Sequence, residues 1–255
     1  MQKPFHEKRR QVFLTEENFI KIIESDKRIL ERQCHNLTLP EDGEHGWHVS
    51  LLNGIAESQL DTLILGYTAG ESIEPMRYAL EDVVAAYERY ATKLREYEDD
   101  PNAMAFPIRS FDGYCPYIWL ISLCYLLHRR DLLPRVALLV DGLDEENAGE
   151  DVLIEELLSY SNDLERYETN TILGVKPYRP LFRAFKTKTN DEAIIKLQEF
   201  LKDWYRDLAA APWHDSHKEG GGYYGYWAFE AAAAVILLGI EDDSSLHQYL
   251  YYPKD

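Results

Sequence analysis

Residues 76–97 read MRYALEDVVAAYERYATKLREY, and the spacing within this stretch decides the fold class. Its apolar side chains recur every three or four positions, at Met76, Leu80, Val83, Tyr87, Tyr90, Leu94 and Tyr97. Such steps place all of them on one face of an α-helix, because the helix has about 3.6 residues per turn. The stretch therefore predicts a long amphipathic helix with one buried face.

Helical patterns continue on the N-terminal side of this stretch. Thr15 precedes Glu16 and Glu17, which predicts a helix start, since threonine accepts hydrogen bonds from free N–H groups and acids favour the positive helix end. We expect this helix to run to about Gln33 and a second one to cover 47–68. A sharp turn at 69–72 would then lead into the long amphipathic helix.

The C-terminal side is also helical in pattern. Residues 116–130 are apolar on nearly every side, which is typical of a helix in the middle of a bundle. Further helices are expected at 131–140, 151–160, 190–208 and 224–238. No alternating stretch predicts a sheet. We predict an all-α protein of roughly 8–10 helices, arranged as one continuous bundle or as two helical subdomains, 1–110 and 111–255, the second carrying the YGYWxFEAAA helix.

The composition is strongly acidic. The 255 residues include 45 Asp and Glu against 27 Lys and Arg, a formal net charge of −18. Nucleic acids and anionic membranes would repel such a chain, so neither is an expected direct partner. A basic protein would be attracted, and the attraction would speed the encounter. Many cytoplasmic proteins are acidic only to stay in solution, so total charge favours a basic partner weakly.

Three features bear on the compartment. The three cysteines form no CxxC pair, as in proteins of a reducing environment. Residues 1–10 are charged and lack the apolar core of a signal peptide. The most apolar long run, 223–240, contains Glu230 and is just short of the roughly 20 apolar residues that span a bilayer. We expect a cytoplasmic protein with no membrane segment.

The acidic residues concentrate in 141–168, DGLDEENAGEDVLIEELLSYSNDLERYE, which holds eleven acids and one base, Arg166, a net charge of −10. We call this stretch the acidic segment. It is either a solvated helix face or a surface that recognises a basic groove. The candidate partner-binding residues are Asp141, Asp144, Glu145, Glu146, Glu150, Asp151, Glu155 and Glu156.

Catalytic motifs are absent from the sequence. It has no GxxxxGK[ST], GxGxxG after a strand, HExxH or GxSxG, so common nucleotide, metalloprotease and acyl-transfer chemistries are unsupported. The residues that come nearest to a metal site are in the run 214–219, HDSHKE. A metal-dependent hydrolase using His214, His217 and Glu230 is one alternative. A general helical adaptor protein is another. We expect neither enzymatic activity nor a cofactor or metal.

Glu230 is the only charged residue between Tyr223 and Ile240. A carboxyl group in so apolar a helix must be hydrogen-bonded or paired, or its pKa rises. Such an acid can serve in catalysis, but no second catalytic candidate stands beside it. We therefore interpret Glu230 as a structural residue that a Tyr, Trp or Arg of a neighbouring helix satisfies.

Two stretches resemble a known family. Residues 223–233, YYGYWAFEAAA, together with Trp213, 242–244 and 252–253, resemble the C-terminal domain of the PoNi immunity proteins. Residues 67–74, YTAGESIE, resemble the characteristic turn of their N-terminal domain. The resemblance implies an all-helical bacterial immunity protein that binds and neutralises a cognate PoNe-type DNase toxin.

This resemblance also implies a setting and a division of roles. Relatives act in the cytoplasm by direct binding, against toxins exchanged in interbacterial competition by systems such as type VI secretion. The most recognisable residues are interpreted as holding the fold, and toxin specificity is expected in the acidic segment. The structural-motif residues are Trp213, Tyr224, Gly225, Trp227 and Glu230.

Overall fold

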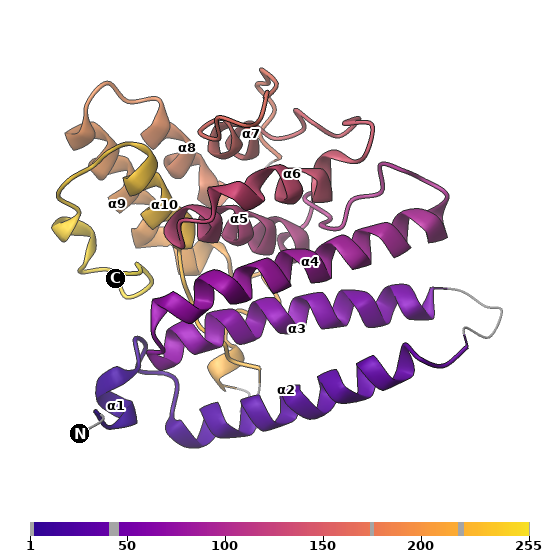
Figure 1. The fold of residues 1–255 in the computed structure, drawn as a ribbon. Coiled ribbons are helices and arrows are strands. Elements are labelled where there is room, and N and C mark those ends of the chain that lie inside the picture. The colour runs from indigo at the N-terminus through magenta and orange to yellow at the C-terminus, as the bar shows by residue number, and fades with distance from the viewer. Residues whose placement is uncertain (1–2, 41–45, 174–175, 219–221, 255) are drawn as a thin grey trace. The chain divides into compact units, whose positions relative to one another are not determined.

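The structure is a computed structural model that describes residues 3–40, 46–173, 176–218 and 222–254. These residues form ten α-helices and four short 3-10 helices, with no strand among them (Figure 1). The all-α prediction is confirmed. The chain divides into two compact units, described separately below. Unit 1 comprises Met1–Ala105 and Asp215–Gly225, and unit 2 comprises Phe106–His214 and Tyr226–Asp255.

Unit 1 is built on three long helices. Its elements are α1 (Phe5–Lys8), α2 (Glu16–Asn36), α3 (Trp47–Ala69), α4 (Ile73–Glu98) and the 3-10 helix η3 (Ser216–Lys218). Helices α3 and α4 pack along each other, and α2 lies against α3 (Figure 1). As predicted, Thr15 caps α2: its Oγ1 accepts a hydrogen bond from the Asn18 N–H at 3.1 Å.

The predicted stripe of α4 forms much of the unit 1 core. Met76, Leu80, Val83, Tyr87 and Leu94 are buried, whereas Tyr97 is 53% exposed near the helix end. Helix α2 differs, because none of its described side chains is fully buried despite its apolar face. Unit 1 therefore has a well-packed α3–α4 pair and a more openly packed third helix.

Unit 2 surrounds one central helix. Its α-helices are α5 (Phe111–Leu126), α6 (Leu133–Asp141), α7 (Val152–Leu158), α8 (Arg179–Phe185), α9 (Asn190–Asp207) and α10 (Phe229–Leu237). Its 3-10 helices are η1 (Arg130–Leu132), η2 (Lys176–Tyr178) and η4 (Ser244–Leu246). Helix α5 packs against α10, α6 and α7, and most of its side chains are buried, including the free thiols of Cys115 and Cys124. The predicted central helix is confirmed.

Two helix starts differ from those expected. Helix α5 begins at Phe111, five residues before Pro116, which lies inside it. Gly113 permits this start, because an added Cβ there would lie 2.4 Å from the backbone nitrogen of Pro107. Helix α10 begins at Phe229 rather than 224. Gly225 has a φ of 138°, which is incompatible with a helix and is readily adopted only by glycine.

No helix in the described part of the chain combines the length and the apolar character needed to cross a lipid bilayer.

Candidate partner-binding surface

Arg166 holds the acidic segment together from inside. Its guanidinium donates to Asp141 Oδ2 at 2.5 Å and to Glu155 Oε1 at 2.6 Å, and all three side chains are only 6–7% exposed. Burial alone would lower the pKa of Arg166, but its hydrogen bonds to both carboxylates raise it above the ordinary value. Burial raises the pKa of Asp141, against the opposing effect of Arg166. One base thus serves two buried acids.

Asp151 is buried in a different way. It caps α7: its Oδ1 accepts from the N–H groups of Leu153 and Ile154, each at 3.0 Å. The same oxygen accepts from the Tyr114 hydroxyl at 3.0 Å, and Oδ2 accepts from the Leu173 N–H at 2.9 Å. Four donors therefore satisfy this carboxylate, which is 1% exposed.

Two further acids are tied down at the surface. Arg109 donates to both oxygens of Glu150, at 2.9 and 2.8 Å. Lys186 forms an ion pair with Glu156. These ion pairs neutralise part of the negative charge of the acidic segment within unit 2.

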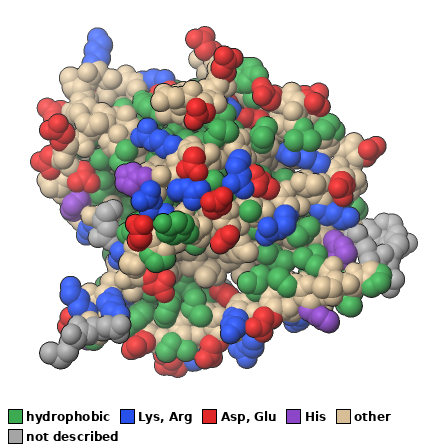
Figure 2. All heavy atoms as spheres, viewed as in Figure 1, with side chains coloured by type: hydrophobic (Ala, Val, Ile, Leu, Met, Phe, Trp, Pro, Cys, Tyr) green, Lys and Arg blue, Asp and Glu red, His purple; other side chains and the backbone are tan. Residues whose placement is uncertain are grey.

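The remaining acids of the segment are exposed. They are Asp144, Glu145, Glu146, Asp163, Glu165 and Glu168, and we call this set the acidic face. Acidic side chains gather along the edge formed by α7 and its flanking loops (Figure 2). Large apolar side chains lie within the same stretch, since Leu143 is 59% and Tyr167 48% exposed. The Tyr167 hydroxyl donates to Glu145 Oε2 at 2.8 Å.

A hollow of about 320 Å³ opens beside this face. Its lining combines apolar and acidic side chains, among them Leu138, Asp141, Glu145, Asp163 and Tyr167. Sequence reasoning missed the exposed Leu143 and Tyr167. In the sequence, each of the two is an apolar residue among acids. This pattern does not by itself distinguish an exposed side chain from a buried one.

The predicted structural-motif residues of unit 2 lie in an aromatic core. Glu230 is fully buried, and its Oε1 accepts from the Trp204 indole N–H at 2.8 Å. Trp213 stacks on Trp204 with ring centroids 5.3 Å apart, and Trp227 stacks on Phe229. Burial raises the pKa of Glu230 to about 8, although its hydrogen bonds act in the opposite direction. Glu230 is therefore mostly neutral near pH 7, and no Lys or Arg in the described part of the chain forms an ion pair with it.

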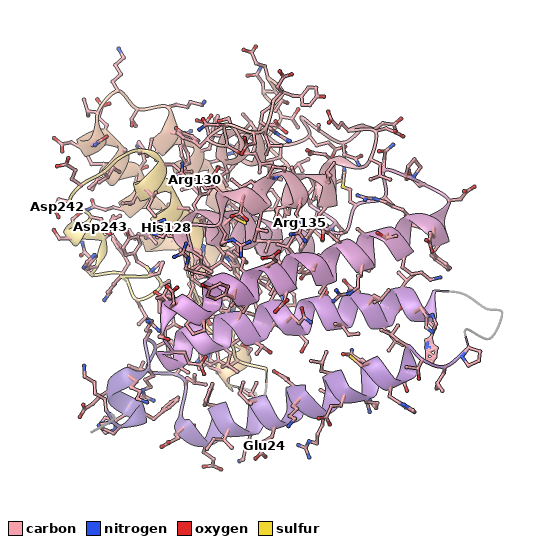
Figure 3. All side chains as sticks on the ribbon, viewed as in Figure 1. Glu24, His128, Arg130, Arg135, Asp242 and Asp243 are labelled. Atoms are coloured by element: carbon pink, nitrogen blue, oxygen red, sulfur yellow. The ribbon has the colours of Figure 1, made fainter. Side chains whose placement is uncertain are left out.

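Asp243 holds the C-terminal end of unit 2 in place through side-chain contacts. It lies next to Asp242 (Figure 3). Asp243 accepts from the Tyr252 hydroxyl and pairs with His247 Nε2 at 3.0 Å. The Asp242 carboxylate accepts from the Ser244 N–H at 3.0 Å. Residues 242–244 and Tyr252, which belong to the stretches that resemble the immunity proteins, thus form one small hydrogen-bonded cluster.

Tyr224 and Gly225 belong to unit 1. The Thr68 hydroxyl, at the end of α3, donates to the Tyr224 carbonyl at 2.5 Å. The adjacent turn contains Gly70 with a φ of 83°, and an added Cβ there would lie 2.0 Å from the Lys8 carbonyl oxygen. Only glycine fits this close approach, so the 67–74 turn anchors the N-terminal segment of unit 1 as well.

The alternative metal site gains no support from the geometry. His214 stacks on Tyr205 with centroids 4.0 Å apart, and His217 lies 4.6 Å from Phe13. In the ranges that the structure covers, no three His, Cys, Asp or Glu side chains are grouped so as to hold a metal ion. Glu219 lies outside the described residues.

Comparison with protein families decides the identity. Residues 10–137 match the family model described as PoNe immunity protein (PoNi), N-terminal, and residues 149–255 match PoNe immunity proteins (PoNi), C-terminal. The chain belongs to the PoNi family. PoNi proteins are immunity proteins against PoNe nuclease toxins rather than enzymes, which confirms the predicted family and the prediction that the chain is not an enzyme.

A solved structure shares the fold of this PoNi protein. It is the crystal structure of protein PA2201 from Pseudomonas aeruginosa, with a TM-score of 0.71 and 20% identity, covering 96% of this chain and 88% of that one. No curated protein matches the chain.

The two PoNi family regions meet inside unit 1. Thr68 lies in the N-terminal family region and Tyr224 in the C-terminal one, and their hydrogen bond joins the two stretches that carry the resemblance. The recognisable PoNi residues described above make contacts within the fold. The acidic face, by contrast, projects outward from unit 2.

Proposed function

We propose that this PoNi protein neutralises a cognate PoNe-type nuclease by binding it directly through the acidic face. Family membership supplies the class of partner. The observation that carries the proposal is that the only base of the acidic segment, Arg166, is bound to Asp141 and Glu155, so the outward side of the segment is almost purely negative. A nuclease needs a positive surface to hold DNA, and an acidic face is complementary to it.

The structure narrows the set of residues proposed to touch the toxin. Asp141, Asp151 and Glu155 are buried in contacts that hold unit 2 together, so we leave them out of the binding surface. Glu150 and Glu156 are partly neutralised by Arg109 and Lys186 and would lie at its margin. Asp144, Glu145 and Glu146 stay in the proposed surface, and Asp163, Glu165 and Glu168 join them.

The exposed Leu143 and Tyr167 would supply affinity. Charges mainly speed association and select among partners, whereas buried aromatic and aliphatic anchors slow dissociation. Tyr167 lies beside Glu145, so one patch offers both kinds of contact. We propose that the carboxylates occupy positions where DNA phosphates would bind and so block DNA entry, in the cytoplasm of the producing cell.

The test reverses charge on the acidic face. The variant Glu145→Lys, Glu146→Lys and Glu165→Lys is compared with a control of equal charge change, Glu31→Lys, Glu98→Lys and Glu241→Lys, all at exposed positions outside the acidic segment in the sequence. The face variant should bind a catalytically inactive copy of the cognate PoNe-type nuclease about 30-fold more weakly, since three surface charges contribute about 2 kcal/mol. Its affinity should also depend less on salt.

A test in cells accompanies the affinity measurement. Cells that express the active nuclease should survive when they also express the wild type or the control variant, but not when they express the face variant. Equal affinity and equal salt dependence in both triple variants would show that the acidic face is not the binding surface.

A further inference from the structure

Helix α2 leaves an open groove in unit 1. A hollow of about 440 Å³ lies between α2, α3 and α4, within the range of pockets that accept a few large side chains. The molecule is visibly hollowed along the inner side of α2 (Figure 2). Because no described side chain of α2 is fully buried, this helix presents an apolar face that α3 and α4 only partly cover.

The floor of this groove is apolar. Helix α2 contributes Ile23 and Leu30, and α3 contributes Leu63. Helix α4 completes the lining with Pro75, Met76, Ala79 and Val83. We call this set the α2 groove. An apolar surface of this kind gains free energy when a side chain displaces water from it.

The rim of the α2 groove is negative. Asp26, Glu71 and Asp82 line it with one base, Lys27. Within the described ranges, Asp26 and Asp82 form no ion pair. Burial raises the pKa of Asp26, and the nearby Asp61 has its pKa raised well above the ordinary value by burial and then by the charges of Glu57 and Asp26. Asp26 and Asp61 therefore lie close enough for each carboxylate to raise the cost of ionising the other.

We propose that the α2 groove binds an amphipathic basic segment of the toxin, with an apolar side chain in the hollow and Lys or Arg side chains at the rim. The inference rests on the proposed function and adds a second contact, in unit 1, to the acidic face of unit 2. The apolar floor of the groove would contact the apolar side of such a segment, and the acidic rim would contact its basic side. Amphipathic helices bind in grooves in this way. Charge complementarity selects this occupant, because the same rim would repel an anionic membrane.

The first test fills the groove without changing charge. Ala79→Phe places a phenyl ring in the hollow, whereas the matched control Ala85→Phe puts the same ring on another side of α4, beside Glu88 and Arg89. We expect Ala79→Phe to weaken binding of the inactive nuclease about 30-fold, the usual loss for a central anchor, and the control to bind as the wild type does.

The second test covers the case in which the filled variant folds poorly. Asp26→Lys reverses a rim charge, and Glu24→Lys reverses an acid two positions away that points outward from α2 (Figure 3). Asp26→Lys should weaken binding about tenfold, mostly through slower association, while Glu24→Lys should change it less than twofold. Unfolding curves of both variants establish that each is folded.

The outcomes separate the two proposals. If the wild type binds the nuclease and all four variants bind equally well, the groove proposal is wrong and the proposed function stands. If the wild type does not bind, both are wrong. If Ala79→Phe instead breaks a wild-type homodimer and leaves nuclease affinity unchanged, the groove belongs to a second copy of this chain and the proposal is overturned.

Discussion

Two of the sites at which unit 2 buries carboxylates hold them in opposite charge states. Asp141 and Glu155 share the guanidinium of Arg166, so the site holds ionised groups of both signs. Glu230 is fully buried, pairs with no Lys or Arg among the described residues, and accepts a hydrogen bond from the Trp204 indole N–H. The first site can keep its acids charged, because a buried charge is tolerated when it is paired. The second keeps its acid protonated.

This difference separates two roles within one unit. The Arg166 site ties the loops around α7 to α6 and leaves the acidic face outside. The Glu230 site lies in the aromatic core that the recognisable family residues build. The proposed partner surface and the aromatic core thus differ in how the buried carboxylates beside them are balanced.

The largest expected effect comes from removing the shared base. Arg166→Met leaves Asp141 and Glu155 buried without a cation, which should lower the free energy of unfolding by about 3–5 kcal/mol. Urea unfolding at pH 7 measures this. The control Arg109→Met removes an arginine that is 71% exposed and should cost less than about 1 kcal/mol. Equal stability of the two variants would contradict the proposed importance of the buried pairing.

The second effect is a pH dependence that belongs to Glu230. Its pKa is about 8 in the folded protein and near 4.5 in the unfolded chain, so between these values the folded state binds the extra proton. Stability contributed by this proton is complete below pH 4.5 and is lost as pH rises towards 8, by about 2–3 kcal/mol between pH 5 and 7.

Glu230→Gln tests this assignment. Gln cannot ionise, and its amide oxygen can still accept from Trp204. The variant should lose this part of the fall in stability between pH 5 and 7, as measured by urea unfolding at several pH values. A pH profile unchanged from the wild type would assign the dependence to other groups.

The smallest effect concerns Asp151, a carboxylate buried by hydrogen bonds alone. Tyr114→Phe removes one of its four donors and should cost about 1–2 kcal/mol. Tyr117→Phe is the matched control, because the hydroxyl of that buried tyrosine donates to a neutral acceptor, the Val136 carbonyl, at 3.3 Å. In thermal unfolding, the midpoint temperature of Tyr114→Phe should therefore be lower than that of Tyr117→Phe. The reverse order would show that the donors of Asp151 are interchangeable.

Local patterns predicted most helices well. The spacing of three and four residues in 76–97 correctly predicted α4, and Thr15 correctly predicted the start of α2. Both features depend on residues that are neighbours in the sequence. The start of α10 was missed. Residues 223–228 are apolar enough for a helix, but the Ala228 N–H donates to the Tyr251 carbonyl at 2.9 Å, a contact invisible to local pattern.

The candidate site was less predictable for a related reason. The eleven acids of 141–168 look alike in sequence, and only tertiary contacts separate the buried Glu155 from the exposed Glu146. Arg166 makes that separation by reaching Asp141 across 25 residues. Composition therefore located the region of interest, whereas the fold decided which of its charges face outward.

The hydrogen bond between Thr68 and Tyr224 has a consequence for making hybrids of these proteins. Residues 215–225 of unit 1 belong to the C-terminal family region. In a chimera that combines the N-terminal region of one relative with the C-terminal region of another, the two partners of this hydrogen bond therefore come from different proteins. Its two halves must agree at the 67–74 turn before either can contribute its own specificity. Swapping the acidic segment alone leaves that hydrogen bond intact, so it is the simpler graft for testing the proposed role of this segment in the choice of toxin.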